Sequence, residues 1–131
     1  MTFQMNGARI GYTRYEFGQI FQIYSQNVYS GFFRDFSFTE MQGRYYISFR
    51  EEAGKTPLIT VEKRRLGPDR NLFVATTPGA RGEPVEIVRS EKIDAFAERL
   101  KAEIAAMRED RSPLSLLRIV SAHSAESTRR S

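Results

Sequence analysis

The stretch between residues 33 and 89 most constrains the fold, because it contains short strand-like runs separated by turn signals. The runs cover residues 33–41, 44–51, 58–65, 72–77 and 85–89. Aromatic or β-branched residues alternate with polar ones in the first two runs, which is typical of strands whose successive side chains point to opposite faces. Parallel strands need crossover connections of about a dozen residues or more. The shorter connections here therefore predict a four- or five-stranded antiparallel sheet.

The second and third runs are joined by a turn with the sequence Gly54-Lys55-Thr56-Pro57. Its first three residues have the composition that ends a phosphate-binding loop. The required upstream glycine is missing, however, and Pro57 leads into a strand rather than a helix, so the backbone N–H groups of a helix start cannot hold a phosphate here. We interpret this segment as a hairpin turn.

A helical pattern precedes the strands. Thr13 and Glu16 have the spacing of a capping box, and Gly31 is suited to end a helix in a left-handed conformation. These signals predict a helix over residues 14–30, although residues 23–29 also suit a strand. The apolar positions recur at spacings of three and four and are Phe17, Ile20, Phe21, Tyr24 and Val28.

A long helix is predicted after the last strand, with Ser90 as its cap. Its apolar stripe consists of Ile93, Phe96, Ala97, Leu100, Ile104 and Met107. Such a helix is expected to bury this stripe against the sheet. With 131 residues the chain suits one domain. We therefore expect an α+β fold with a leader at 1–12, a single domain at 13–110 and a partly disordered extension at 111–131.

The positive charge is concentrated in the middle of the chain. The formal net charge is +4, and residues 44–82 hold eight basic and four acidic residues, whereas basic and acidic residues balance on either side. A localised basic sheet is the pattern expected of a protein that binds a polyanion. The alternative is that this excess only keeps a small domain soluble.

The sequence contains no arrangement of residues that indicates catalysis. Cysteine is absent, and His123 is the single histidine, in a polar segment where it has no partner for a catalytic or metal site. Glu51 and Glu52 are adjacent on a strand end and so point to opposite faces. We expect a protein that is not an enzyme and has no cofactor. It also lacks a secretory signal and an apolar run of about 20 residues, so we expect it in the cytoplasm.

Aromatic and basic residues are interleaved in the predicted sheet. Single-stranded nucleic acid is bound by cations that follow its backbone and by rings on which its bases stack. The candidate nucleic-acid-binding residues are Tyr46, Arg50, Lys63, Arg64, Arg65 and Arg70. In the alternative interpretation, Tyr46 lies under a helix and the basic residues form solvated ion pairs with Glu51, Glu52 and Glu62.

Scattered positions between residues 24 and 107 resemble the bacterial version of the purine-rich-element-binding (PUR) repeat. They are Tyr24, Ser25, Val28, Gly31, Arg34, Phe36, Tyr45, Tyr46, Ile47, Glu51, Glu91, Phe96, Leu100 and Ile104. The resemblance implies a curved antiparallel sheet crossed by one helix, a dimer, and binding of single-stranded DNA or RNA on the sheet. It also makes residues 24–29 a strand rather than a helix.

A second set of positions is similar to a small bacterial family of unknown function, and its match over residues 12–36 has no gap. This set comprises Tyr12, Arg14, Glu16, Ile20, Tyr24, Val28, Gly31, Arg34, Asp35, Phe36, Phe49, Arg50, Pro57, Leu58, Glu62 and Lys63. The similarity implies no activity. It leaves the function to be argued from the residues themselves.

The leading hypothesis is a non-enzymatic single-stranded nucleic-acid binder that acts as a homodimer. The alternative is an adaptor or accessory subunit that docks on a protein partner through the sheet edge or through residues 114–120. The apolar side chains of that segment are Leu114, Leu116, Leu117, Ile119 and Val120.

Overall fold

A computed structural model describes residues 11–110 of the chain. Its elements are, in order, α2 (Arg14–Gln26), β1 (Asp35–Met41), β2 (Arg44–Arg50), β3 (Ile59–Gly67), β4 (Arg70–Pro78), β5 (Pro84–Ser90) and α3 (Ile93–Asp110). The five strands pair antiparallel in the order β1-β2-β3-β4-β5. The predicted α+β fold, with a helix before and a long helix after an antiparallel meander, is confirmed.

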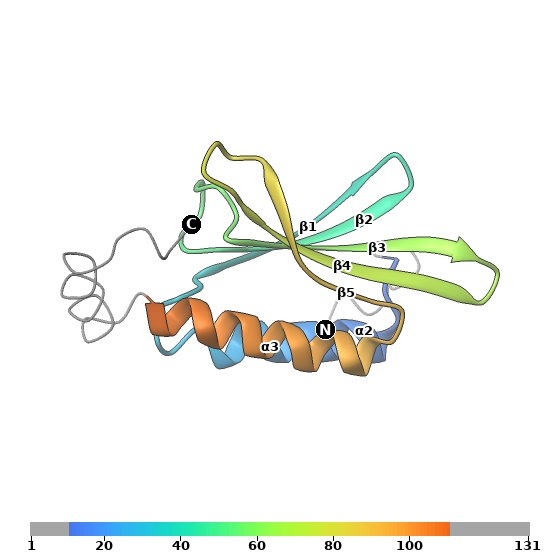
Figure 1. Cartoon of the computed structure of the whole chain (residues 1–131), viewed down its shortest axis with the longest axis horizontal. Helices are drawn as coiled ribbons and strands as arrows, with labels where there is room; N and C mark the ends of the chain where they lie inside the picture. Colours follow the sequence, from blue (N-terminus) through green and yellow to red (C-terminus); the bar gives the residue numbers. More distant parts are fainter. Residues whose placement is uncertain (1–10, 111–131) are drawn as a thin grey trace, which may run out of the picture.

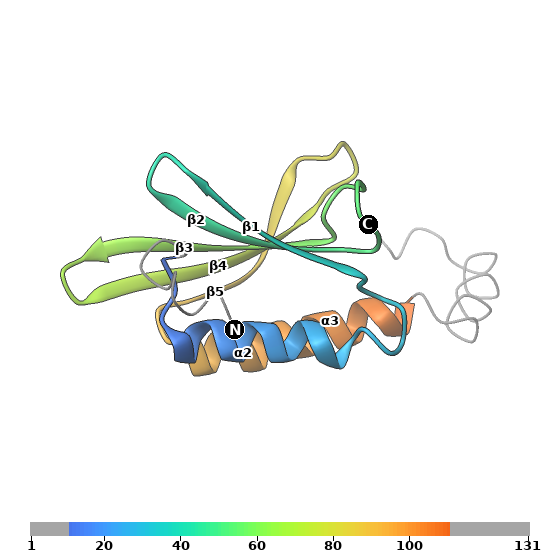
Figure 2. The same ribbon diagram turned by 180° about the vertical axis from the view of Figure 1, so that it is seen from behind.

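Both helices lie on one face of the sheet, side by side and running in the same direction (Figure 1). The view from behind shows the same two layers, with α2 and α3 both below the sheet and neither on its other face (Figure 2). Hydrogen bonds join the two helices near both ends: the Tyr15 hydroxyl donates to Asp94, and the Arg108 guanidinium donates to Asn27. The structure is therefore a two-layer arrangement of one sheet and one helix pair.

The hydrophobic core fills the space between the sheet and the helices. Ile47, Phe49 and Val61 are completely buried on this side. Towards α3, the rings of Phe73 and Phe96 lie 5.7 Å apart between centroids. Towards α2, rings from the helix pack on those of β1 and β2, which is a favourable use of large aromatic side chains. This second group consists of Phe17, Phe21, Tyr24, Phe36, Phe38 and Phe49.

Helix α2 begins with the predicted capping box. The Thr13 hydroxyl accepts from the Glu16 N–H, and the Glu16 carboxylate accepts from the Thr13 N–H. The helix ends at Gln26 rather than at residue 30, because the side-chain amide of Asn27 donates to the Ile23 carbonyl at 2.7 Å and closes the last turn. Gly31 has a φ of +78° but lies in the turn that follows. The strand interpretation of residues 23–29 was wrong.

The start of α3 also differs in detail from the prediction. The Lys92 carbonyl accepts the first helical N–H, from Phe96 at 2.9 Å, so Lys92 occupies the cap position. Ser90 lies two residues earlier and accepts from the Lys92 N–H at 3.1 Å. Among the described residues, neither helix has the length and apolarity needed to cross a membrane.

Candidate nucleic-acid interface

The sheet presents one face that neither helix covers, which we call the open face. The strand register places Thr39, Tyr46, Glu62, Val74 and Arg89 in one row across it. A neighbouring row consists of Ser37, Ser48, Thr60, Thr76 and Glu86. The β1–β2 hairpin and the β4–β5 turn both rise on this side, so the open face lies between them (Figures 1 and 2). Its centre is closely packed, since Ser48, Glu62 and Val74 are buried there.

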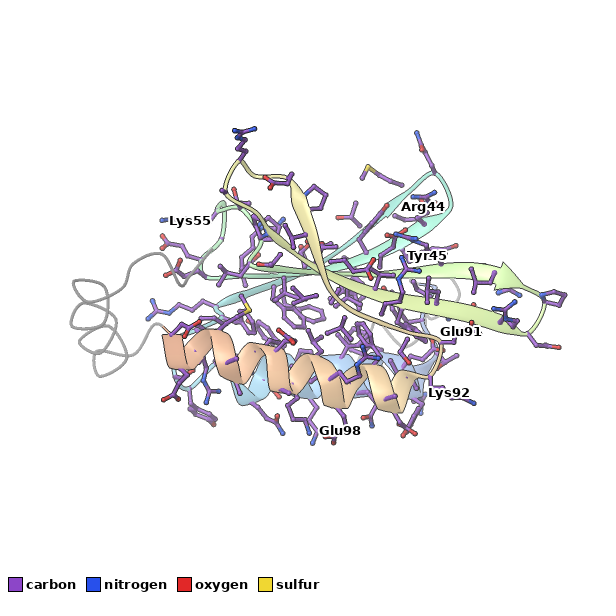
Figure 3. The ribbon with its side chains drawn as sticks, in the orientation of Figure 1. Arg44, Tyr45, Lys55, Glu91, Lys92 and Glu98 are labelled. Atoms are coloured by element: carbon purple, nitrogen blue, oxygen red, sulfur yellow. The ribbon has the colours of Figure 1, made fainter. Side chains whose placement is uncertain are left out.

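Two arginines on the open face share one carboxylate. Glu62 Oε2 lies 3.6 Å from Nη1 of Arg44 and 3.1 Å from Nε of Arg64. The Glu62 side chain is only 12% exposed, whereas that of Arg44 is 60% exposed. The Arg64 contact has the distance of an ion pair but not the alignment of a hydrogen bond, so the Arg64 Nε–H still lacks an acceptor. This Nε atom is buried, so an anion can approach only the exposed parts of the two side chains, of which 60% is exposed for Arg44 and 38% for Arg64. Figure 3 shows Arg44 on the side of the sheet away from the helices.

Arg50 is held more firmly at the far end of the same strand. Its Nη1 donates to Asp35 at 3.2 Å and to the Ser37 hydroxyl at 2.7 Å, while its Nε donates to the Lys55 carbonyl at 2.9 Å. These bonds tie β1, β2 and the following loop together. Arg50 adds positive charge to the open face, but its orientation is fixed by its neighbours.

Arg89 brings a further guanidinium to the open face from β5. It forms a two-pronged pair with Glu86, with distances of 2.8 and 2.9 Å. This hydrogen-bonded pair lowers the pKa of Glu86, and the positive charge of Arg64 lowers it further. The positive charge of Arg64 on β3 therefore acts across β4 on Glu86, the partner of Arg89. The arginine group of the open face comprises Arg44, Arg50, Arg64 and Arg89.

Tyr46 is the one aromatic residue of the five strands that lies on the open face. It is half-buried, between Thr39 and Glu62 on the neighbouring strands. The remaining strand aromatics, Phe36, Phe38, Tyr45, Phe49 and Phe73, all pack on the helix side. Tyr46 is therefore placed next to Arg44 and Arg64 rather than under a helix.

The remaining predicted residues lie elsewhere. Lys63 points to the helix side, where its Nζ is 2.7 Å from Glu16 Oε1 and 2.8 Å from the Gly11 carbonyl, with 10% of its side chain exposed. Arg65 follows at the exposed end of β3, beyond the core. Arg70 binds Glu91, in the β5–α3 connection, at 2.7 and 3.1 Å. Tyr46 and Arg64 lie close to Glu62 on the open face, whereas Arg50 shares this face but lies four positions from Tyr46, at the other end of β2.

Arg44 and Arg89 were not among the predicted site residues. Arg44 precedes Tyr46 by two positions, and side chains two apart on a strand share a face, so its position could have been inferred from the sequence. Arg89 is different, because it reaches the open face only through the pairing of β4 with β5, in which it lies opposite Val74. That register contains an irregularity between Ala75 and Thr76 that the sequence does not indicate.

Within residues 11–110, no three acidic, histidine or cysteine side chains are grouped as they would be in a metal site. A scan against protein-family models, a search of curated proteins and a search of solved structures each found no match. The functional argument therefore rests on the chemistry of the open face.

Proposed function

We propose that the open face binds single-stranded DNA or RNA without catalysing a reaction. The observation that carries this proposal is the placement of Arg44 and Arg64 beside Tyr46 on a sheet face that neither α2 nor α3 covers. Phosphates are attracted to the guanidinium groups, and an unpaired base can stack on the tyrosine ring. Bases in a duplex are stacked on each other, so Tyr46 favours single strands.

Arg44 and Arg64 are the central cations of the proposal. Both contact the same buried Oε2 atom of Glu62, while 60% of the Arg44 side chain and 38% of the Arg64 side chain remain exposed to a ligand. Planar guanidinium groups suit phosphate because they offer parallel N–H donors. Thr60 and Thr76 lie in the neighbouring row, on the other side of Tyr46 and Glu62 from the two arginines, and their half-buried hydroxyl groups are further donors.

The test is fluorescence anisotropy with labelled single-stranded and duplex oligonucleotides over a range of salt concentrations. The double variant Arg44→Ala/Arg64→Ala is compared with Lys92→Ala/Lys101→Ala, which loses the same charge from the helix side. Each lost phosphate contact reduces the slope of log affinity against log salt by about 0.7 for a single strand. We expect the first variant to lose affinity and about 1.4 of slope, and the control to change little. Absence of binding to any single strand at low salt would refute the proposal.

A protein-interaction role is the second candidate, and the edge strand β1 favours it. Phe38 on β1 and Phe21 on α2 are 38% and 41% exposed, and their rings belong to one aromatic cluster. The other predicted docking segment, residues 114–120, lies outside the described residues. Deleting residues 111–131 separates the two functions: loss of a co-purifying protein with unchanged nucleic-acid binding would favour an adaptor. In either role we expect the protein in the cytoplasm.

A further inference from the structure

Among residues 11–110, strand β1 forms one edge of the sheet. It is joined to β2 by the two-residue turn Gln42-Gly43, whose φ angles are +53° and +78°. In such a hairpin the residues flanking the turn form a hydrogen-bonded pair, and these pairs recur at every second residue. Met41 and the residues at spacings of two before it therefore bond to β2. The backbone N–H and C=O groups of Phe36, Phe38 and Glu40 point away from the sheet and are available to another strand.

The side chains along β1 form a self-complementary sequence. Phe36 and Phe38 point to the helix side, with the cationic Arg34 before them and the anionic Glu40 after them. Both charged side chains are exposed, and neither forms an ion pair within residues 11–110. The guanidinium of Arg34 lies next to Gly31, in the turn that leaves α2. When a second copy of β1 runs antiparallel to the first, its Glu40 therefore lies near Arg34 of the first copy, and its Arg34 lies near Glu40.

We propose that a second copy of this chain docks on β1, with the two β1 strands antiparallel about a two-fold axis at Ser37. In this register Phe36 of one copy lies opposite Phe38 of the other, and Arg34 lies opposite Glu40. Aromatic pairs and opposite charges placed directly across from each other stabilise strand pairing. The contact is isologous, so it closes as a dimer instead of continuing as a fibre.

The exposed aromatic surface supports a second copy as the occupant. Phe21 lies beside β1, with its ring 5.3 Å from that of Phe36 and stacked near Phe17, and it is 41% exposed. A two-fold axis perpendicular to the sheet keeps both helix layers on the same side, so the α2 helices of the two copies come together there. Phe21 and Phe38 of both copies are then covered. Both open faces also lie on one side of a single continuous sheet.

Cross-linking tests the register directly, because the chain contains no cysteine of its own. Ser37 lies on the axis in a position without hydrogen bonds, where Cα atoms approach to about 4.5 Å, close enough for a disulfide. We expect Ser37→Cys to form a disulfide-linked dimer on mild oxidation. In the matched variant Thr39→Cys, residue 39 of one copy lies opposite residue 35 of the other. The two introduced cysteines are then four positions, or about 13 Å, apart along the strands and should not cross-link. Equal cross-linking of both variants, or of neither, would overturn the proposed register.

Exchanging the charges of Arg34 and Glu40 tests whether the partner on β1 is a second copy of this chain. Arg34→Glu and Glu40→Arg each place two like-charged pairs in the dimer, and each is expected to raise the dimer dissociation constant about tenfold by sedimentation equilibrium. The double variant Arg34→Glu/Glu40→Arg restores opposite charges and should return it to the wild-type value. Glu103→Arg, on the exposed surface of α3, is the control and should change nothing. A monomeric wild type, or a double variant as weak as the single ones, would show that the partner is not a second copy. No nucleic acid is present in either assay, so these results are independent of the proposed function.

Discussion

The Nζ atom of Lys63 lies 2.7 Å from Oε1 of Glu16, beneath the sheet. The two side chains are 10% and 12% exposed. The same Oε1 atom accepts the Thr13 N–H at 2.8 Å, so one carboxylate closes the capping box of α2 and also neutralises the cation of β3. The Gly11 carbonyl accepts a second hydrogen bond from Lys63. This ion pair fixes the start of α2 to β3, the central strand of the sheet.

Lys63→Ala should lower the free energy of unfolding by about 3 kcal/mol, because it leaves a mostly buried carboxylate without its partner. Urea denaturation measures the change. The double variant Lys63→Met/Glu16→Gln removes both charges. Its loss in free energy of unfolding should be smaller than the sum of the losses caused by Lys63→Met and Glu16→Gln alone. Arg89→Ala breaks the solvent-exposed pair with Glu86 and should change the free energy of unfolding much less, because water and salt screen that pair. Equal losses for Lys63→Ala and Arg89→Ala would contradict the interpretation of Lys63 as an interior residue.

Tyr12 should make stability sensitive to alkaline pH. Its hydroxyl donates to the Tyr45 and Val61 carbonyls, and burial raises its pKa well above the ordinary value of 10.0, with a further rise from the negative charge of Glu16. Because the folded-state pKa is the higher one, this stability is fully present below about pH 10 and is lost as the pH rises towards the folded-state pKa. Urea denaturation at pH values from 9 to 11, about one unit either side of the ordinary pKa, measures the effect. The free energy of unfolding should decline less with pH in Tyr12→Phe than in the wild type. An identical decline in both proteins would show that ionisation of Tyr12 does not cause the loss.

Tyr46→Ala should weaken binding of single-stranded oligonucleotides by about five- to hundredfold, the range expected for loss of one stacked base. Tyr46→Phe keeps the ring and should bind like the wild type. Anisotropy titrations at one fixed salt concentration measure both variants, and circular dichroism checks that they fold. If Tyr46→Phe is as weak as Tyr46→Ala, the hydroxyl rather than the ring makes the contact.

Glu62→Gln should strengthen binding. The carboxylate of Glu62 lies between Arg44 and Arg64 and competes with a phosphate for both. A unit charge about 4 Å away is worth ~1 kcal/mol in water, which corresponds to about fivefold in affinity. Titration at low salt measures the gain, and the difference from wild type should shrink as salt is added. Weaker binding by Glu62→Gln would indicate that Glu62 positions the two arginines rather than opposing the ligand.

Arg64 and Arg65 are adjacent in sequence but should differ in function. Successive strand residues point to opposite faces, and only Arg64 shares the open face with Tyr46 and Glu62. Arg64→Ala should reduce affinity and salt dependence, whereas Arg65→Ala removes an equal charge and should have little effect. The same titration serves both variants. A larger loss with Arg65→Ala would place the binding surface on the other side of the β3–β4 hairpin.

The elements of the fold could be predicted because their signals are local. Thr13 and Glu16 lie within one turn of each other, and the alternation of Tyr45, Ile47 and Phe49 is contained in one strand. The end of α2 was misplaced because Gly31 has the expected positive φ without being the residue after the last turn. Asn27 ends the helix instead, through a side-chain bond and a contact with Arg108, which lies 81 residues away in sequence.

The candidate site was less predictable because it depends on which sheet face the helices cover. Strand β3 carries buried residues on both sides, Val61 on one and Glu62 on the other, so its pattern does not distinguish inside from outside. Lys63 stands in a basic run with Arg64 and Arg65, which suggested a common role. Only the position of Glu16 on α2 shows that Lys63 belongs to the interior.

The two helices lie side by side although α2 is the first and α3 the last element within residues 11–110. During synthesis, α2 and the five strands leave the ribosome before α3, whose Phe96 packs on Phe73, has emerged from it. Until α3 emerges, the apolar surface at Phe73 is open to chaperones and to other nascent chains. The apolar surface of the sheet is therefore covered only once α3 has packed on it. A chain truncated before Ile93 is expected to aggregate or to bind chaperones.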